Sequence, residues 1–205
     1  MSNNVFEEQV SEYLRYNGFF LIRDFVIHFE NAQAQEIDFV GIRLPESVEQ
    51  TMYSDGYFST FVFQDDGERL SFSETPEIVL LVAEVTESKT EIKRQIDRLR
   101  NPIRIRYALQ RLGIIGEKDV DRLIHKDRAS YIEGVGTRLL RILFVLTSRI
   151  AEKCQEENPD IAFISQSDVL SFIEERAKID IKERARTLLP RWLHFSVDKL
   201  LHHKR

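Results

Sequence analysis

The segment Ile78–Thr86 constrains the fold of this chain more than any other, because it is short and almost wholly apolar. A run of this length and composition is typical of a central strand that is covered on both faces of a sheet. One acidic residue, Glu84, interrupts the run. A carboxylate inside such a strand is costly unless it is paired, hydrogen-bonded or bound to a metal ion. The segment therefore predicts both a central strand and a polar site built into it.

A second carboxylate, Asp38, stands in the apolar surroundings of the predicted strand 35–43. If the two strands are neighbours, Asp38 and Glu84 can share one site near the strand ends. Two carboxylates, the backbone carbonyl of Val85 and water molecules are ligands that suit Mg²⁺ or Mn²⁺. A structural hydrogen-bonding network is the alternative interpretation of the same two carboxylates.

The remaining pattern predicts helices and strands in alternation. The first helix, over residues 4–17, has the capping-box pair Asn4 and Glu7, and Glu7 lies at the flank of the apolar stripe. A second capping-box pair, Ser88 and Glu91, begins the helix after the central strand. The other predicted elements are a strand over 19–29, a helix that ends at Pro102, a helical region over 103–133 with a break near Gly113 and Gly116, strands over 139–146 and 161–164, a helix over 167–178, and a terminal helix over 180–202 broken around Pro190.

Residues 44–76 are predicted to form an inserted arm. Residues 57–63 and 69–73 are strand-like, and Asp65-Asp66-Gly67 between them indicates a hairpin turn. Residues 46–87 hold ten acidic residues and one basic residue. An acidic arm of this kind is a candidate contact for a protein partner.

Length and composition favour one domain. The 205 residues are 42% hydrophobic and include a single cysteine, Cys154, which excludes an internal disulfide. We expect a domain over residues 1–178, with the arm inserted into it, and a helical tail over 179–205. No apolar run reaches the roughly 18 residues of a membrane span, and the first residues lack a signal-like segment, so a cytoplasmic protein is expected.

The charge of the chain is unevenly distributed. The net charge of −5 argues against general nucleic-acid binding, but residues 89–111 hold eight basic residues against two acidic ones. A basic face on an acidic protein can follow the phosphates of a nucleic acid, whereas the alternative is a solvated helix face. The candidate nucleic-acid-binding residues are Arg98, Arg104 and Arg106.

Three segments together resemble the PD-(D/E)xK nuclease superfamily, which has the restriction-endonuclease-like fold. Residues 6–19 resemble the opening helix of that family, 36–40 resemble the strand with its metal-binding aspartate, and 82–86 resemble the strand with its (D/E)-x-K motif. The resemblance implies an α/β fold with a mixed central sheet flanked by helices. It also implies hydrolysis of DNA phosphodiester bonds with Mg²⁺ or Mn²⁺. The implied site residues are Glu7, Asp38 and Glu84, with the Val85 carbonyl as a further metal ligand.

The chain departs from the family at Thr86, which stands where the family places its lysine. Lys89 and Lys93 are candidates for a replacement lysine, because they follow the strand on one side of the next helix. The sequence thus supports an active metal-dependent nuclease, or a catalytically inactive member of the same fold that serves as a nucleic-acid-binding or assembly subunit. An unrelated α/β protein is a third hypothesis. The sequence leaves open RNA in place of DNA, a protein partner bound through the arm, and a homodimer.

Overall fold

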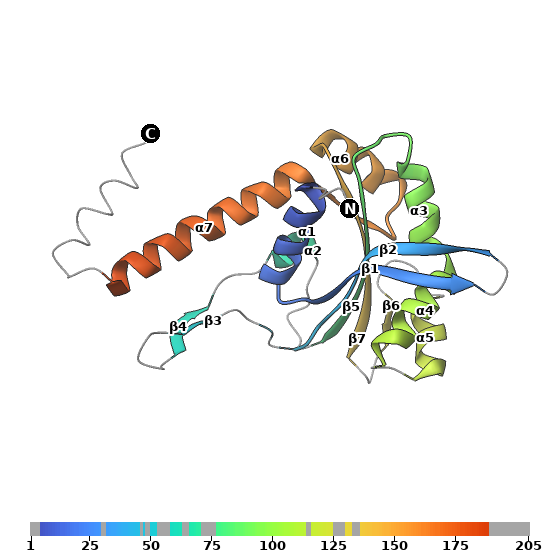
Figure 1. Cartoon of the computed structure of the whole chain (residues 1–205), viewed down its shortest axis with the longest axis horizontal. Helices are drawn as coiled ribbons and strands as arrows, with labels where there is room; N and C mark the ends of the chain where they lie inside the picture. The colour runs from blue at the N-terminus through green and yellow to red at the C-terminus, as the bar shows by residue number, and fades with distance from the viewer. Residues whose placement is uncertain are drawn as a thin grey trace.

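The computed structural model describes residues 5–29, 32–45, 47, 50–52, 58–62, 66–70, 77–113, 116–124, 130–132 and 136–188. A mixed sheet runs through the middle of the molecule and helices lie on both of its faces (Figure 1). The strands are β1 (Phe20–Phe29), β2 (Ala32–Arg43), β3 (Gln50–Met52), β4 (Phe58–Val62), β5 (Ile78–Thr86), β6 (Ser130–Ile132), β7 (Thr137–Val145) and β8 (Ala162–Ser165). The helices are α1 (Val5–Tyr16), α2 (Gly67–Leu70), α3 (Ile92–Arg100), α4 (Pro102–Leu112), α5 (Glu117–Ile124), α6 (Ser148–Glu157) and α7 (Gln166–Leu188).

The main sheet has six strands. Its order is β1-β2-β5-β7-β6, and β8 also pairs with β7. β2 is antiparallel to both β1 and β5, whereas β7 is parallel to both β5 and β8. This confirms the predicted α/β fold with a mixed central sheet flanked by helices, and it places Ile78–Thr86 between two other strands as predicted.

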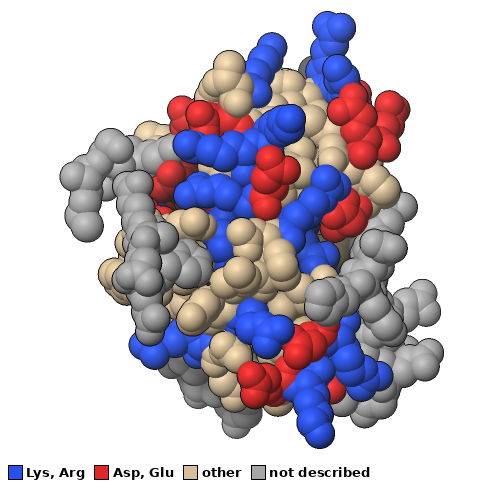
Figure 2. Space-filling view, turned by 90° about the vertical axis from the view of Figure 1, so that its right-hand side faces the viewer, with Lys and Arg blue, Asp and Glu red and all other residues tan. Residues whose placement is uncertain are grey.

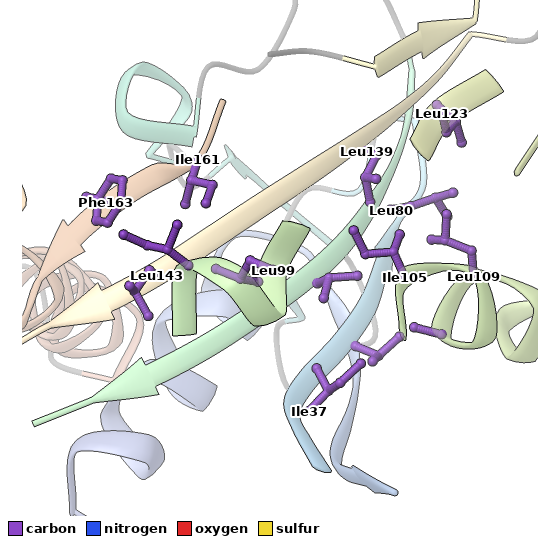
Figure 3. Packing of buried hydrophobic residues seen from close by; sticks show 14 of the residues in the cluster. Ile37, Leu80, Leu99, Ile105, Leu109, Leu123, Leu139, Leu143, Ile161 and Phe163 are labelled. Atoms are coloured by element: carbon purple, nitrogen blue, oxygen red, sulfur yellow. The ribbon is translucent and has the colours of Figure 1, made fainter. Parts of the chain in front are cut away.

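The strand β5 contributes to a separate hydrophobic core on each face of the sheet. Leu80 and Val82 belong to the first core, together with side chains from α3 to α6. Figure 3 shows part of this core, including Leu80 with Leu99 and Ile105. Leu81 and Ala83 point to the opposite face and belong to the second core, which α1 and α7 cover. The alternation follows from the two-residue period of a strand. It also explains why the segment is apolar almost throughout.

The prediction that residues 57–63 and 69–73 pair as a hairpin is wrong. β4 pairs with β3, which precedes it, and Gly67–Leu70 form the helical turn α2 where the chain was expected to continue as a hairpin. Tertiary contacts explain the difference: Leu70 is fully buried in the second core, and the Tyr13 hydroxyl donates a hydrogen bond of 2.8 Å to Asp66. The aspartate of the supposed turn is therefore a buried anchor. Residues 71–73 lie outside the described part of the chain.

Two predictions for the region after β5 are also wrong. Ser88 and Glu91 do not form a capping box, because α3 has Glu91 itself at the N-cap and no capping hydrogen bond from that side chain. The helical region predicted over 103–133 contains α4 and α5, with the expected break after Leu112, but its last residues form β6, which pairs with β7.

The C-terminal half contains a helix that the sequence pattern did not predict. Ala151 is the only buried residue of this helix, α6, so its apolar pattern is weak. The helix predicted over 167–178 is longer than expected, because α7 continues without a break to Leu188. The predicted boundary between domain and tail at residue 178 thus falls inside one helix. Pro190 and the residues after it lie outside the described residues.

None of the helices in the described part of the chain combines the length and the apolar character that crossing a membrane requires.

Candidate functional site

The two carboxylates predicted to share a site do lie on neighbouring strands. β2 and β5 pair with Phe39 opposite Ala83, so Asp38 and Glu84 occupy the next position along the ladder. The Val85 amide donates a hydrogen bond of 2.6 Å to Asp38 Oδ2. The Glu84 side chain lies on the same face of β5 as Leu80 and Val82, beneath α3 and α4. Strand pairing therefore brings the two acidic groups together inside the first core.

An arginine neutralises Glu84 from within the core. Arg104, on α4, is 1% exposed and donates a hydrogen bond of 2.9 Å from its guanidinium to Glu84 Oε1. The same guanidinium nitrogen also donates to the backbone carbonyl of Glu36 on β2. Arg104 thus joins α4 to two strands. Its burial corrects the prediction that it lies on a nucleic-acid-binding surface, because a guanidinium in this position cannot reach a phosphate in solvent.

A second arginine stands on the other side of Glu84. The Arg98 guanidinium on α3 is 3.9 Å from Glu84 Oε2 and donates a hydrogen bond of 3.0 Å to the Gln95 side chain. At that distance Arg98 supplies charge without a hydrogen bond. Within the described residues, Glu84 Oε2 is a buried atom with no hydrogen-bond donor. A proton on the neighbouring Asp38 carboxyl would supply one.

Burial is the main cause of the perturbed acidities in this cluster. Burial first, and the neighbouring Glu84 carboxylate second, raise the pKa of Asp38 to about 7, against the lowering effect of the Val85 amide. Burial also raises the pKa of Glu84 above its usual range, although Arg104 and Arg98 oppose the shift. Burial lowers the pKa of Arg104, and Glu84 acts against that change. The group behaves as one coupled charge cluster.

The other predicted site residues lie away from this cluster. Glu7 is half-buried on α1, and the buried face of α1 packs in the second core, on the opposite face of the sheet from Glu84. Arg106, on α4, forms an ion pair with Asp121 on α5 near the surface. Among the described residues, no group of three His, Cys, Asp or Glu side chains could hold a metal ion. Asp38 and Glu84 therefore meet without Glu7.

The two candidate lysines line a different feature. Lys89 and Lys93 are exposed and border a groove between α3 and α6. Neither Asp38 nor Glu84 is among the described residues that line this groove. Thr86, at the position of the family lysine, is buried, and its hydroxyl is hydrogen-bonded to the backbone of Ser88. The threonine therefore shapes the turn after β5.

The residues present match a divalent cation only in part. Asp38 and Glu84 supply carboxylate oxygens, and the Val85 amide already donates to one of them. Two carboxylates and two guanidinium groups already balance in charge when all are ionised. A divalent cation would leave two uncompensated positive charges in a buried place unless an arginine moved away, and such charges are costly. Arg104 could leave only by unpacking α4.

The role of Arg104 could have been found in the sequence. Residues 104, 105, 108 and 109 form one stripe at helical spacing, and all four are buried. An arginine within an apolar stripe indicates a buried partner, and Glu84 was the unpaired buried acid. The basic residues Arg149 and Lys153 were missed for another reason, because the helix α6 that bears them was not predicted.

Comparisons of the chain with protein-family models, with curated proteins and with solved structures found no match.

Proposed function

We propose that this protein is a catalytically inactive, nucleic-acid-binding member of the PD-(D/E)xK superfamily, in which arginine takes the place of the metal ion. The observation that carries the proposal is the buried hydrogen bond of 2.9 Å between Arg104 and Glu84. In a metal-dependent site, the cation neutralises the paired carboxylates. Here Arg104 supplies that charge from inside the core, so the carboxylates act as a structural link between α4 and the sheet.

The arrangement of elements supports the family assignment. The segments that resemble the opening helix, the aspartate strand and the glutamate strand form α1, β2 and β5. The last two are adjacent in the sheet, as a shared site requires.

The position of Thr86 supports the loss of catalysis. A threonine hydroxyl cannot supply the positive charge of the family lysine, and this one is committed to Ser88. The charged groups that act most strongly on Glu84 are Arg104 and Arg98. A guanidinium already carries its full set of protons, so an arginine cannot accept a proton from the attacking water.

A metal-dependent nuclease is the second candidate, and the adjacency of Asp38 and Glu84 favours it. In that function the two carboxylates would hold Mg²⁺ or Mn²⁺, and the ion would supply Lewis-acid stabilisation of charge on a phosphodiester. Arg104 would then have to release Glu84.

The two candidates differ in their response to divalent cations. Under our proposal, millimolar Mn²⁺ leaves the melting temperature of the wild-type protein unchanged. Arg104→Met leaves Glu84 buried without its partner, which should cost roughly 3–5 kcal/mol of unfolding free energy. It should also create a Mn²⁺ response, because a cation can then bind the native state and stabilise it.

The matched control is Arg106→Met on the same helix, whose guanidinium pairs with Asp121 at the surface. This variant should lose at most about 1 kcal/mol and gain no Mn²⁺ response. Cleavage of DNA or RNA by the wild-type protein with Mn²⁺, abolished by Asp38→Ala, would contradict the proposal and establish the nuclease. The Asp38→Ala variant is needed as a control, because a contaminating nuclease would cleave equally in its presence.

A further inference from the structure

A groove of about 730 Å³ runs between α3 and α6. Figure 2 shows the face of the molecule on the side where α3 lies in Figure 1. Lys and Arg side chains gather on the upper part of that face, with Asp and Glu side chains between them (Figure 2). The cationic residues that line the groove are Lys89, Lys93, Arg100, Arg149 and Lys153, and the acidic ones are Asp97 and Glu157.

Three of these cations are available to a ligand. Arg100 is engaged by Asp160, and Lys153 lies 3.9 Å from Glu157. Within the described part of the chain, no acidic side chain pairs with Lys89, Lys93 or Arg149. Lys89 lies in the turn before α3, Lys93 at the start of α3 and Arg149 at the start of α6, so these cations stand on both sides of the groove.

The position of the groove in the fold is one where α/β proteins bind ligands. A smaller adjoining pocket of about 70 Å³ shares Lys89 and Thr147 with it and reaches Thr86 and Val145, the last residues of β5 and β7. These two strands are parallel. A crevice outside the carboxyl ends of parallel strands is the usual place for a ligand in an open α/β sheet.

The residues that line the groove favour a duplex backbone over single strands or free bases as its ligand. Its apolar part consists of isoleucines 92, 96 and 150 with Cys154, and none of the described residues that line it is aromatic. Proteins that hold single strands or free bases stack them on aromatic rings, which this groove lacks. Cations on the two sides of a groove instead suit phosphates that follow one another along a duplex backbone.

We propose that the groove between α3 and α6 binds the phosphodiester backbone of double-stranded nucleic acid, with Lys89, Lys93 and Arg149 as its phosphate contacts. The inference rests on the nucleic-acid-binding part of the proposed function and adds the surface and the strandedness of the ligand. It also gives Lys89 and Lys93 a role in binding phosphate, separate from the Asp38–Glu84 cluster.

The first experiment measures duplex DNA affinity over a range of salt concentrations. The groove variant is Lys89→Glu, Lys93→Glu and Arg149→Glu, and the matched control is Arg15→Glu, Lys118→Glu and Lys178→Glu, which changes the net charge equally with exposed residues on other helices. The groove variant should lose about tenfold or more in affinity at low salt and reduce the slope of log K against log salt by roughly two to three. The control should lose much less. An equal loss in both variants would overturn the proposal, because net charge alone would then explain binding.

The second experiment uses Cys154, the single cysteine of the chain, which lines the groove. Saturating duplex DNA should slow alkylation of Cys154 by a maleimide in the wild-type protein and in the control. Unchanged alkylation at saturation would place the DNA elsewhere and overturn the proposal. Equal protection by ATP or inorganic phosphate would overturn it in favour of a small phosphorylated ligand, and preference for single strands would overturn the duplex assignment.

The failures of the two proposals can be told apart. A wild-type protein that binds no nucleic acid would remove this inference and the binding part of the proposed function, but not the metal response expected of Arg104→Met. A wild-type protein that cleaves DNA with Mn²⁺ would remove the catalytic part of the proposed function, and the groove would still be tested by its variants.

Discussion

At the scale of single residues, the cluster around Glu84 shows how a buried carboxylate can be satisfied without a metal ion. Asp38 accepts from a backbone amide and Glu84 accepts from Arg104, so each acid has one strong donor. The sequence identified both acids, because a charge within an apolar run is costly. It did not identify their partner, since Arg104 stands among several basic residues and only its helical phase distinguishes it from Arg106.

The raised pKa of Asp38 makes its effect on stability depend on pH. Between its ordinary value of 3.8 and about 7, the native state holds a proton on Asp38 that the unfolded state has released. The native state binds more protons in this window, so Asp38 makes the free energy of unfolding fall as pH rises, by at most about 1.4 kcal/mol per pH unit. Asp38→Asn should remove this contribution, because an amide can still accept from Val85 and can donate to Glu84.

Urea denaturation of both proteins between pH 4 and pH 8 tests this expectation. The difference in unfolding free energy between Asp38→Asn and wild type should shift in favour of the variant as pH rises through that window, and titrating groups that do not interact with Asp38 cancel in the difference. A difference that stays constant with pH would mean that Asp38 ionises normally in the native protein.

At the scale of secondary-structure elements, predictions succeeded where apolar residues recur with a clear helix or strand period. They failed where tertiary contacts determine the local conformation. The central strand β5 and the helix α1 follow directly from their apolar patterns. The helical turn α2 replaces a predicted hairpin because Leu70 and Asp66 are held by the core. The helix α6 was missed because it lies at the rim of the sheet and buries little apolar surface. The groove depends on α6, so it could not be predicted from the sequence.

The hydrogen bond between Tyr13 and Asp66 joins α1 to the residue before α2 across 53 residues of sequence. Burial and Asp66 both raise the pKa of the Tyr13 phenol, so the hydroxyl remains a donor. Tyr13→Phe removes that donor from a buried carboxylate and should lower the unfolding free energy by roughly 1–3 kcal/mol in urea denaturation. Tyr16→Phe is the matched control, because its hydroxyl bonds to Glu12 at the exposed end of the same helix. Equal effects of the two substitutions would show that Asp66 does not anchor the arm.

At the scale of the whole molecule, the two hydrophobic cores share the strands β5 and β7. Neighbouring residues of β5 point alternately into one core and the other, so neither core can form before the sheet does. The long-range strand pairing, antiparallel on one side of β5 and parallel on the other, joins segments far apart in the sequence. These features favour a single cooperative unit over independent layers.

Leu80 and Leu81 allow this expectation to be tested with matched substitutions, because both are fully buried and they point to opposite faces. Leu80→Ala and Leu81→Ala should each lower the unfolding free energy by roughly 2–5 kcal/mol, since each leaves a cavity in a packed core. The transition should remain single in both variants, with far-UV circular dichroism and tyrosine fluorescence giving the same urea midpoint. Two separable transitions, one sensitive to Leu80→Ala and the other to Leu81→Ala, would instead mean that each face of the sheet is stable without the other. Because the Glu84 cluster lies in the Leu80 core, such a result would also allow α3 and α4 to open and Arg104 to leave Glu84 while the rest of the fold persists.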